Sequence, residues 1–182
     1  MKNSGRLVLL SVAVASFLLM VAPLEAEIVQ KCISKTAGFT IEFPTGWQIW
    51  EKPKDVVALI AFRPKEKEDE ICFERLGVAF LEYVGEDPDA FLEKQISDLQ
   101  RDLPDFVLVS RGSEELPEFS SRVLVYTFTD AFLTIKARAK TKQWIIQRNE
   151  RIYLITATAT VESFPQYEEI FQKIVGSFRV TL

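Results

Sequence analysis

The sequence predicts an α+β domain in which helices cover an antiparallel sheet. Two segments carry apolar residues at helical spacing, and several other runs alternate apolar and polar residues or are apolar over the length of a strand. Most of the strand-like runs follow one another without an intervening helix, an order typical of antiparallel sheets. We therefore expect the two helices to bury their apolar stripes against the sheet.

The strands predicted before the first helix are joined by short connections. Residues 39–43 alternate and place their large apolar side chains on one face. A Pro-Thr-Gly turn follows, and the chain resumes an extended run over residues 47–50. Residues 56–62 form a continuous apolar strand, and residues 71–84 form a longer one in which Gly77 is the candidate for a bulge.

The first helix is predicted to begin at Asp87 and to stop at Pro104. Asp87 can accept hydrogen bonds from the free backbone N–H groups of the first turn, and Pro88 suits the first helical position. The apolar stripe of this helix consists of Leu92, Ile96, Leu99 and Leu103.

Four more strands and a second helix complete the chain. The strands are predicted over residues 106–110, 122–129, 132–147 and 152–161. In the second helix, Ser163 and Gln166 have the spacing of a capping box, Pro165 stands near the start and Gly176 marks the end. Its buried stripe is expected to consist of Tyr167, Ile170, Phe171, Ile174 and Phe178.

Residues 1–26 have the composition of a secretory signal peptide. Lys2 and Arg6 precede the apolar run 7–21, which is shorter than the roughly 20 residues that a membrane-spanning helix needs. We expect cleavage after Ala26, a single mature domain over residues 27–182, and a location in a periplasm, a thylakoid lumen or the extracellular space. The alternative is an uncleaved N-terminal membrane anchor.

The composition excludes several classes of chemistry. The chain has no histidine, which excludes Ser-His-Asp and Cys-His catalysis and histidine-ligated zinc. It has no glycine-rich phosphate loop, and its net charge of −4 argues against nucleic acid as a main ligand. The acidic residues gather in predicted loops, where we expect them to be solvated. We therefore expect no catalytic residue, metal or cofactor; the remaining enzymatic alternative is a carboxylate-based hydrolase.

The two cysteines of the chain, Cys32 and Cys72, allow two interpretations. In an oxidising compartment they can form one disulfide, which would stabilise the fold by about 4 kcal/mol in the chain-entropy model. Alternatively, they are two buried free thiols in neighbouring strands.

Basic residues recur at every second position of the strand predicted over residues 132–147. Period-two spacing places them on one face of the sheet, together with the aromatic side chain that follows. The residues are Lys136, Arg138, Lys140, Lys142 and Trp144. One interpretation is a solvated outer face. The other is a docking surface for an acidic protein or anionic lipid headgroups, with the tryptophan as its anchor.

Two further tryptophans, Trp47 and Trp50, follow the first strand and turn. We expect both to pack in the core or over the edge of the sheet. The alternative is that they line a ligand pocket.

Four segments, taken in order, resemble the PsbP-like superfamily, which includes photosystem II extrinsic proteins, DcrB-like envelope proteins and Ran-binding factors. They are the strand and turn over residues 38–47, the helix after Asp87-Pro88, the hairpin strand over 151–158 and the closing helix ending at 176–178. The resemblance implies an α/β/α sandwich with a central antiparallel sheet, and mostly non-enzymatic work as an accessory domain. The histidines that bind metal in some photosynthetic members have no counterpart here.

These observations predict an exported, non-catalytic accessory or interaction domain. Its expected partner is a protein or a membrane-surface complex, so the domain would be peripheral to a membrane rather than inserted in it. The alternative is an envelope protein that binds a small ligand in a pocket between sheet and helix near Trp47.

Overall fold

The computed structural model describes residues 28–52, 56–65, 67, 73–83, 87–131 and 136–181. Its strands are β1 (Ile28–Ser34), β2 (Phe39–Pro44), β3 (Gln48–Glu51), β4 (Val57–Phe62), β5 (Arg75–Glu82), β6 (Val107–Glu115), β7 (Ser120–Asp130), β8 (Ala137–Arg148), β9 (Arg151–Thr160) and β10 (Arg179–Val180). The helices in these ranges are α1 (Pro88–Asp102) and α2 (Phe164–Gly176). The signal peptide predicted over residues 1–26 lies outside the described residues.

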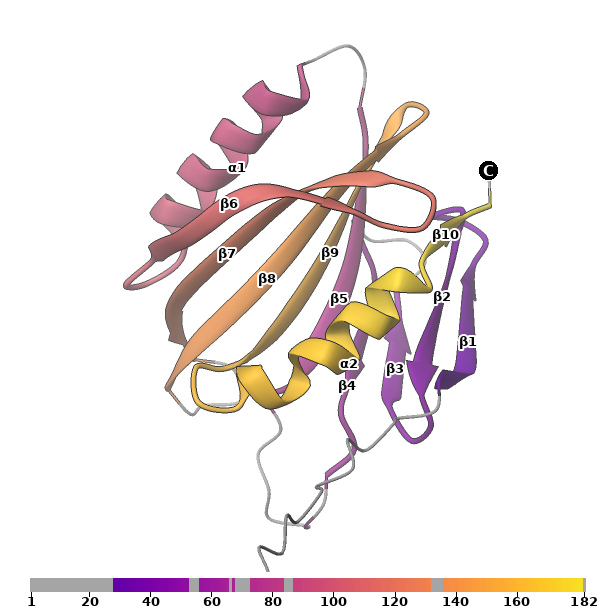
Figure 1. Ribbon diagram of the computed structural model, residues 1–182, viewed down its shortest axis with the longest axis horizontal. Coiled ribbons are helices and arrows are strands. Elements are labelled where there is room, and N and C mark those ends of the chain that lie inside the picture. Colours follow the sequence, from indigo (N-terminus) through magenta and orange to yellow (C-terminus); the bar gives the residue numbers. More distant parts are fainter. Residues whose placement is uncertain are drawn as a thin grey trace, which may run out of the picture.

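Seven strands form one antiparallel sheet in the order β3-β4-β5-β9-β8-β7-β6 (Figure 1). The remaining strands form a small sheet, β1-β2-β10, in which the end of the chain pairs with β2. The long central strands β8 and β9 are joined by a tight hairpin, in which Arg148 pairs with Arg151 and Asn149 has a positive φ of 55°. Asparagine tolerates this conformation better than most residues, so it suits the turn between the strands predicted over residues 132–147 and 152–161.

The bulge predicted at Gly77 is wrong. Gly77 pairs regularly with Ile60 of β4 and with Thr156 of β9. The irregularity lies instead in β4, where the register shifts between Val57 and Leu59. A glycine in a strand permits a bulge but does not require one, and here the extra residue belongs to the neighbouring strand.

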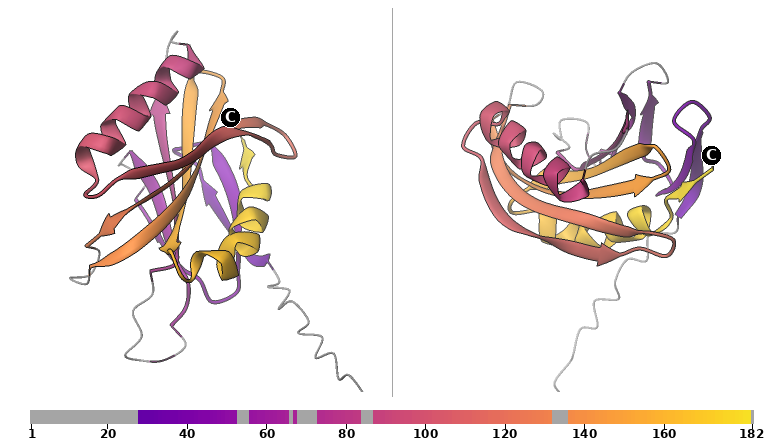
Figure 2. Two further views of the ribbon diagram at one scale, coloured as in Figure 1. Left: turned by 60° about the vertical axis from the view of Figure 1, so that its left-hand side comes forward. Right: turned by 90° about the horizontal axis from the view of Figure 1, so that it is seen from above.

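The two helices pack on opposite faces of the large sheet (Figure 2). Helix α2 shares its face with the small sheet and closes a large core of aromatic and aliphatic side chains. Helix α1 packs through Phe91 and Leu92 on apolar side chains of β7, β8 and β9. Within the described residues, this second cluster includes nothing from β3 or β4, so α1 covers only part of its face. The predicted α+β class is therefore confirmed as an antiparallel sheet with two packed helices; because a small sheet shares the α2 face, a simple α/β/α sandwich is not established.

The two helix starts differ from each other. Asp87 caps α1 as predicted, and its side chain accepts a hydrogen bond from the backbone N–H of Asp89 at 3.2 Å. The capping box predicted for α2 is wrong, because the side chain of Ser163 makes no capping hydrogen bond. Its hydroxyl instead donates to Oε1 of Glu74 at 2.7 Å, which ties the start of α2 to the chain just before β5. Neither helix is long and apolar enough to cross a membrane, a finding that concerns the described residues alone.

Candidate functional site

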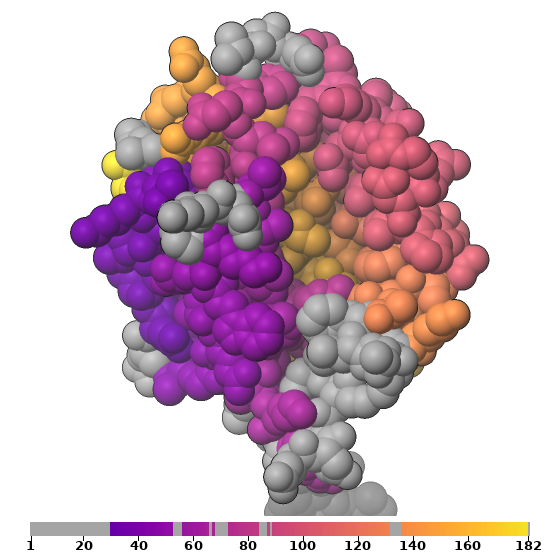
Figure 3. All heavy atoms as spheres, turned by 180° about the vertical axis from the view of Figure 1, so that it is seen from behind, coloured from indigo at the N-terminus to yellow at the C-terminus, as the bar shows by residue number. Residues whose placement is uncertain are grey.

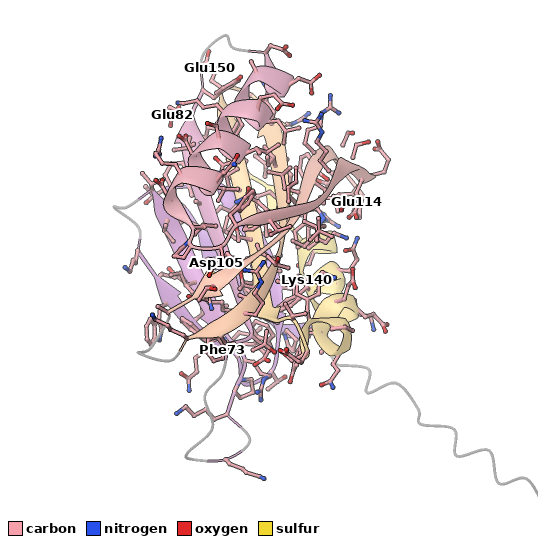
Figure 4. All side chains as sticks on the ribbon, turned by 90° about the vertical axis from the view of Figure 1, so that its left-hand side faces the viewer. Phe73, Glu82, Asp105, Glu114, Lys140 and Glu150 are labelled. Carbon is pink, nitrogen blue, oxygen red and sulfur yellow. The ribbon has the colours of Figure 1, made fainter. Side chains whose placement is uncertain are left out.

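The predicted basic face of β8 is not a continuous exposed surface. Lys136 is exposed, but the half-buried Arg138 donates hydrogen bonds to the backbone oxygen of Asp105 at 2.7 Å and to Oγ1 of Thr127 at 2.6 Å. Lys140 lies next to α2, with Nζ 4.5 Å from the ring centroid of Phe164 (Figure 4). Arg138 and Lys140 therefore already have partners within the domain.

Lys142 and Trp144 are buried, so their predicted exposure is wrong. Their exposed fractions are 9% and 1%. The alternation of β8 was predicted correctly, but its basic face is the one that α2 covers. Because β8 is central and both its faces are covered, the long aliphatic stems of the lysines pack inside the domain. A partner-binding role for Lys136, Arg138 and Lys140 stays a prediction.

Glu114 holds these buried groups together near the end of β6 (Figure 4). Its carboxylate pairs with Nζ of Lys142 at 2.5 Å and accepts hydrogen bonds from Nε1 of Trp144 at 2.9 Å and Nε2 of Gln172 at 3.1 Å. Burial alone would raise the pKa of Glu114, but these three hydrogen bonds and the Lys142 charge outweigh it and keep the pKa below its ordinary value. The network locks β6, β8 and α2 to one another.

The two tryptophans near the N-terminal strands have opposite environments. Trp47 is 5% exposed and packs against Phe43 and Phe171, so the predicted core packing is confirmed. Trp50 is 57% exposed and contacts only the edge of the core, with its ring 5.0 Å from that of Phe62. Of the two expected placements, Trp50 therefore has the one at the edge of the sheet, because β3 is an edge strand.

A groove lies between α1 and the part of the sheet that α1 leaves uncovered. In Figure 3, atoms of β9 are visible at the bottom of this hollow, between β4 on one side and α1 on the other. Its volume is about 270 Å³. One wall consists of Leu99 of α1 and Leu103, the residue that follows α1, and the opposite wall consists of Val57 and Ile60 of β4. Trp50 pairs with Ile60 across the strands, so it stands on the same face at the rim of the groove.

The floor of the groove is neutral and rich in hydroxyl groups. The hydroxyls of Thr141 and Thr158 are 2.8 Å apart and share a hydrogen bond. Next to them, Oγ1 of Thr156 accepts a hydrogen bond from Nε2 of Gln143 at 3.1 Å. The buried phenol of Tyr126 also lines the groove, and its burial raises its pKa well above the ordinary value, so it stays protonated.

Among the described residues that line the groove, Arg75 is the one charged side chain, and it forms an ion pair with Asp130. Both side chains are largely buried. The pair therefore adds little net charge to the groove.

No family model and no curated protein sequence matches the chain. Solved structures do match. Cyanobacterial PsbP (CyanoP) from Synechocystis has a TM-score of 0.57 and 14% identity, with 84% of this chain and 92% of that chain covered. LpqN of Mycobacterium tuberculosis, described as involved in cell envelope biogenesis, has a TM-score of 0.58 and 14% identity, with 84% and 91% covered. PA94 from Pseudomonas aeruginosa, a protein of unknown function, has a TM-score of 0.50 and 17% identity, with 76% and 88% covered.

The chain has a PsbP-like fold. The resemblance noted from the four sequence segments is thereby confirmed at the level of the fold. Identities of this size carry no catalytic or binding residue over to this PsbP-like domain.

The described part of the PsbP-like domain has no group of three or more acidic or cysteine side chains that could hold a metal ion. Cys32 is a buried free thiol whose Sγ donates to Oε1 of Glu51 at 3.3 Å. Burial, with the hydrogen bond and the charge of Glu51, raises the pKa of Cys32 to about 12. Cys72 lies outside the described residues, so the Cys32–Cys72 disulfide stays a prediction.

Sequence reasoning missed both Glu114 and the groove. Glu114 was assigned to a solvated loop, although a lysine on a strand with two covered faces calls for a carboxylate partner. Thr156 and Thr158 of β9 line the groove together, as the period-two spacing of a strand predicts. Nothing in the sequence indicated that α1 would leave that face partly open.

Proposed function

We propose that this protein is an exported, non-catalytic accessory domain that binds another protein, alone or in a membrane-associated complex. Support for export comes from the signal-like residues 1–26 and from the similarity to LpqN, a protein involved in cell envelope biogenesis. The similarity to CyanoP supports an accessory role, and it does so through the fold alone.

The exposed aromatic edge at β3 is the observation that carries the proposal. Trp50 is 57% exposed on β3, which among the described strands pairs with β4 alone and ends the large sheet. Tryptophan is enriched among the residues that dominate protein–protein binding energy. An edge strand also offers backbone hydrogen bonds to a second chain. We infer that a partner covers Trp50 and pairs along β3.

The most buried carboxylates support a non-catalytic role. Glu74 pairs with Arg63 at 3.1 Å and also accepts a hydrogen bond from the hydroxyl of Ser163. Asp130 forms an ion pair with Arg75. Glu114 is held by Lys142, Trp144 and Gln172 as described above. Carboxylates engaged in this way stabilise the fold and are poorly placed to act as a general acid and a general base.

Site-specific photocrosslinking in the native host tests this proposal. Trp50 is replaced by a benzophenone-bearing phenylalanine, and the same replacement at Val109 of the opposite edge strand, β6, serves as the control. The two positions are matched, because their side chains are 57% and 56% exposed. We expect one discrete adduct in the envelope fraction from position 50 and none from position 109. Absence of an adduct at position 50, or the same adducts at both positions, contradicts the proposal.

A further inference from the structure

We propose that the groove beneath α1 binds a small, uncharged molecule that has an apolar body and one hydrogen-bonding group. This inference goes beyond the proposed function, because it requires no partner protein and concerns the groove rather than the edge of β3. It rests on the walls, the floor and the charge of the groove.

The walls select an apolar body. Leu99 and Leu103 face Val57 and Ile60 across the groove, and Leu154 and Phe128 add further apolar surface. Sites for small molecules are usually concave and mostly apolar, with a few polar groups that fix the orientation of the ligand. Burying a ring system between these walls would stabilise the complex by about 25 cal/mol for each Å² removed from water.

The floor selects a hydrogen-bonding group. Oγ1 of Thr156 accepts a hydrogen bond from Nε2 of Gln143, and in the described part of the chain the O–H of Thr156 has no acceptor. Gln143 is 4% exposed and is not one of the lining residues, so the O–H of Thr156 is the group that a ligand can reach. The hydrogen-bonding capacity of this part of the floor is therefore not saturated. A ligand that carries a hydroxyl, amide or amine can use it without leaving its own polar group unpaired.

The charge of the groove selects against an ionised ligand. Asp130 already neutralises Arg75, and the other polar side chains that line the groove are hydroxyls. Tyr126 is protonated because burial raises its pKa. A ligand carboxylate or sulfonate would lose its hydration without gaining an unengaged cation, and this loss costs several kcal/mol for a buried charge.

Gly77 lines the groove, so a side chain introduced at this position can fill the groove. A Cβ built on Gly77 meets only the backbone oxygen of Leu59, at 3.8 Å, which is an ordinary contact. A valine here therefore fits the strand and extends its methyl groups into the groove. Valine also favours β-strands, so Gly77→Val should block the groove without lowering stability.

The experiment compares two fluorescent probes that share one ring skeleton. N-phenyl-1-naphthylamine is uncharged and carries one N–H donor, whereas 1-anilinonaphthalene-8-sulfonate adds a sulfonate to the same rings. Both are titrated into the purified mature domain and into Gly77→Val. Gly112→Val is the matched control, because Gly112 is another strand glycine, lies outside the groove and has no atom within 4 Å of a built Cβ. Circular dichroism and thermal unfolding check that each variant is folded.

We expect the uncharged probe to bind at one site and to bind more than about tenfold more tightly than the sulfonate. Gly77→Val should lower the affinity for the uncharged probe by more than about tenfold, while Gly112→Val should leave this affinity unchanged. Any one of three results overturns the inference: no binding of the uncharged probe, equal affinity for both probes, or equal affinity of Gly77→Val and the parent domain. Loss of crosslinking at position 50 would leave this inference standing, because the titration contains no partner protein.

Discussion

The two faces of the large sheet are built from the same strands, but they are covered to different extents. On the α2 face, the small sheet and α2 bury Trp144, Phe171 and Phe178 almost completely. On the other face, α1 covers β7, β8 and β9 and leaves a groove of about 270 Å³ toward β4, with Trp50 exposed at its rim.

Because of this difference, the closed face should contribute more to stability and the open face more to binding. A face that is closed by aromatic packing contributes most of the apolar burial and tolerates little change. A face with an uncovered apolar strip contributes less to stability and keeps surface available for a ligand or a partner. Substitutions on the closed face should therefore lower the free energy of unfolding more than substitutions at the groove or at the edge of β3.

The largest effect is expected from truncating an aromatic side chain of α2. Phe171→Ala should lower the free energy of unfolding by about 3–5 kcal/mol, because the ring is fully buried against Trp47 and Phe164 and its loss leaves a cavity. Leu99→Ala on α1 should cost only about 1 kcal/mol, because Leu99 borders the open groove. Urea denaturation measures both. Equal losses would remove the distinction between a closed face and an open one.

Glu114→Gln should destabilise the domain by about 1–2 kcal/mol at neutral pH, because it leaves Lys142 buried without its charged partner. The effect should depend on pH. The folded pKa of Glu114 lies below its ordinary value of 4.5, so the stabilisation is present above that pH and is lost as the pH falls below it.

Glu115→Gln is the matched control for this prediction, because Glu115 is the exposed neighbour on the same strand. Urea denaturation at pH 7 and at pH 3 should show the difference between the two variants at pH 7 and its decrease at pH 3. If the two variants are equally stable at pH 7, the network around Glu114 does not lock the closed face.

Cys32 belongs to the closed face and should be chemically protected. At pH 8 the native thiol should react with a disulfide reagent more than about tenfold more slowly than in denaturant, because its pKa is raised to about 12 and the thiolate is the reactive form. Stability linked to this thiol is present below its ordinary pKa of 9.0 and should decrease as the pH rises toward 12, an effect that Cys32→Ala removes.

Thiol counting in denaturant without reductant tests the predicted disulfide. Two reactive thiols would exclude the Cys32–Cys72 disulfide, and the absence of reactive thiols would support it.

The smallest effect is expected from Trp50→Ala, which should change the free energy of unfolding by less than about 1 kcal/mol. Its side chain is 57% exposed and contacts Phe62 at the edge of the sheet, so little buried area is lost. Thermal unfolding of the two proteins in parallel measures this change. A loss comparable to that of Phe171→Ala would show that Trp50 is a structural residue, and the proposed binding edge would then lose its main support.

Much of the fold could be predicted from local patterns. The cap at Asp87, the stripes of both helices and the turn at Asn149-Glu150 depend on neighbouring residues, which the sequence displays directly. The errors arise where a side chain bonds a residue far away in the sequence instead of its local neighbours. Ser163 donates to Glu74, which precedes it by 89 positions, instead of capping its own helix, and no local signal announces such a partner.

The candidate site could be predicted much less well. Period two correctly placed Lys142 and Trp144 on one face of β8, but the same period cannot say which face a helix covers. The two tryptophans Trp47 and Trp50 look alike in the sequence, and only the order of the strands makes one a core residue and the other an edge residue.

The sequence by itself determined where strands and helices form, that histidine-dependent chemistry is absent, and that the order of segments is PsbP-like, because propensity, periodicity and composition act locally or over the whole chain. Only the tertiary structure decided that α1 stops short of β4, that a hydroxyl-lined groove opens beside it, and that the basic strand is enclosed by α2. The physical reason is that burial and ion pairing depend on segments far apart in the chain, and their packing is set by the whole domain rather than by any one of them.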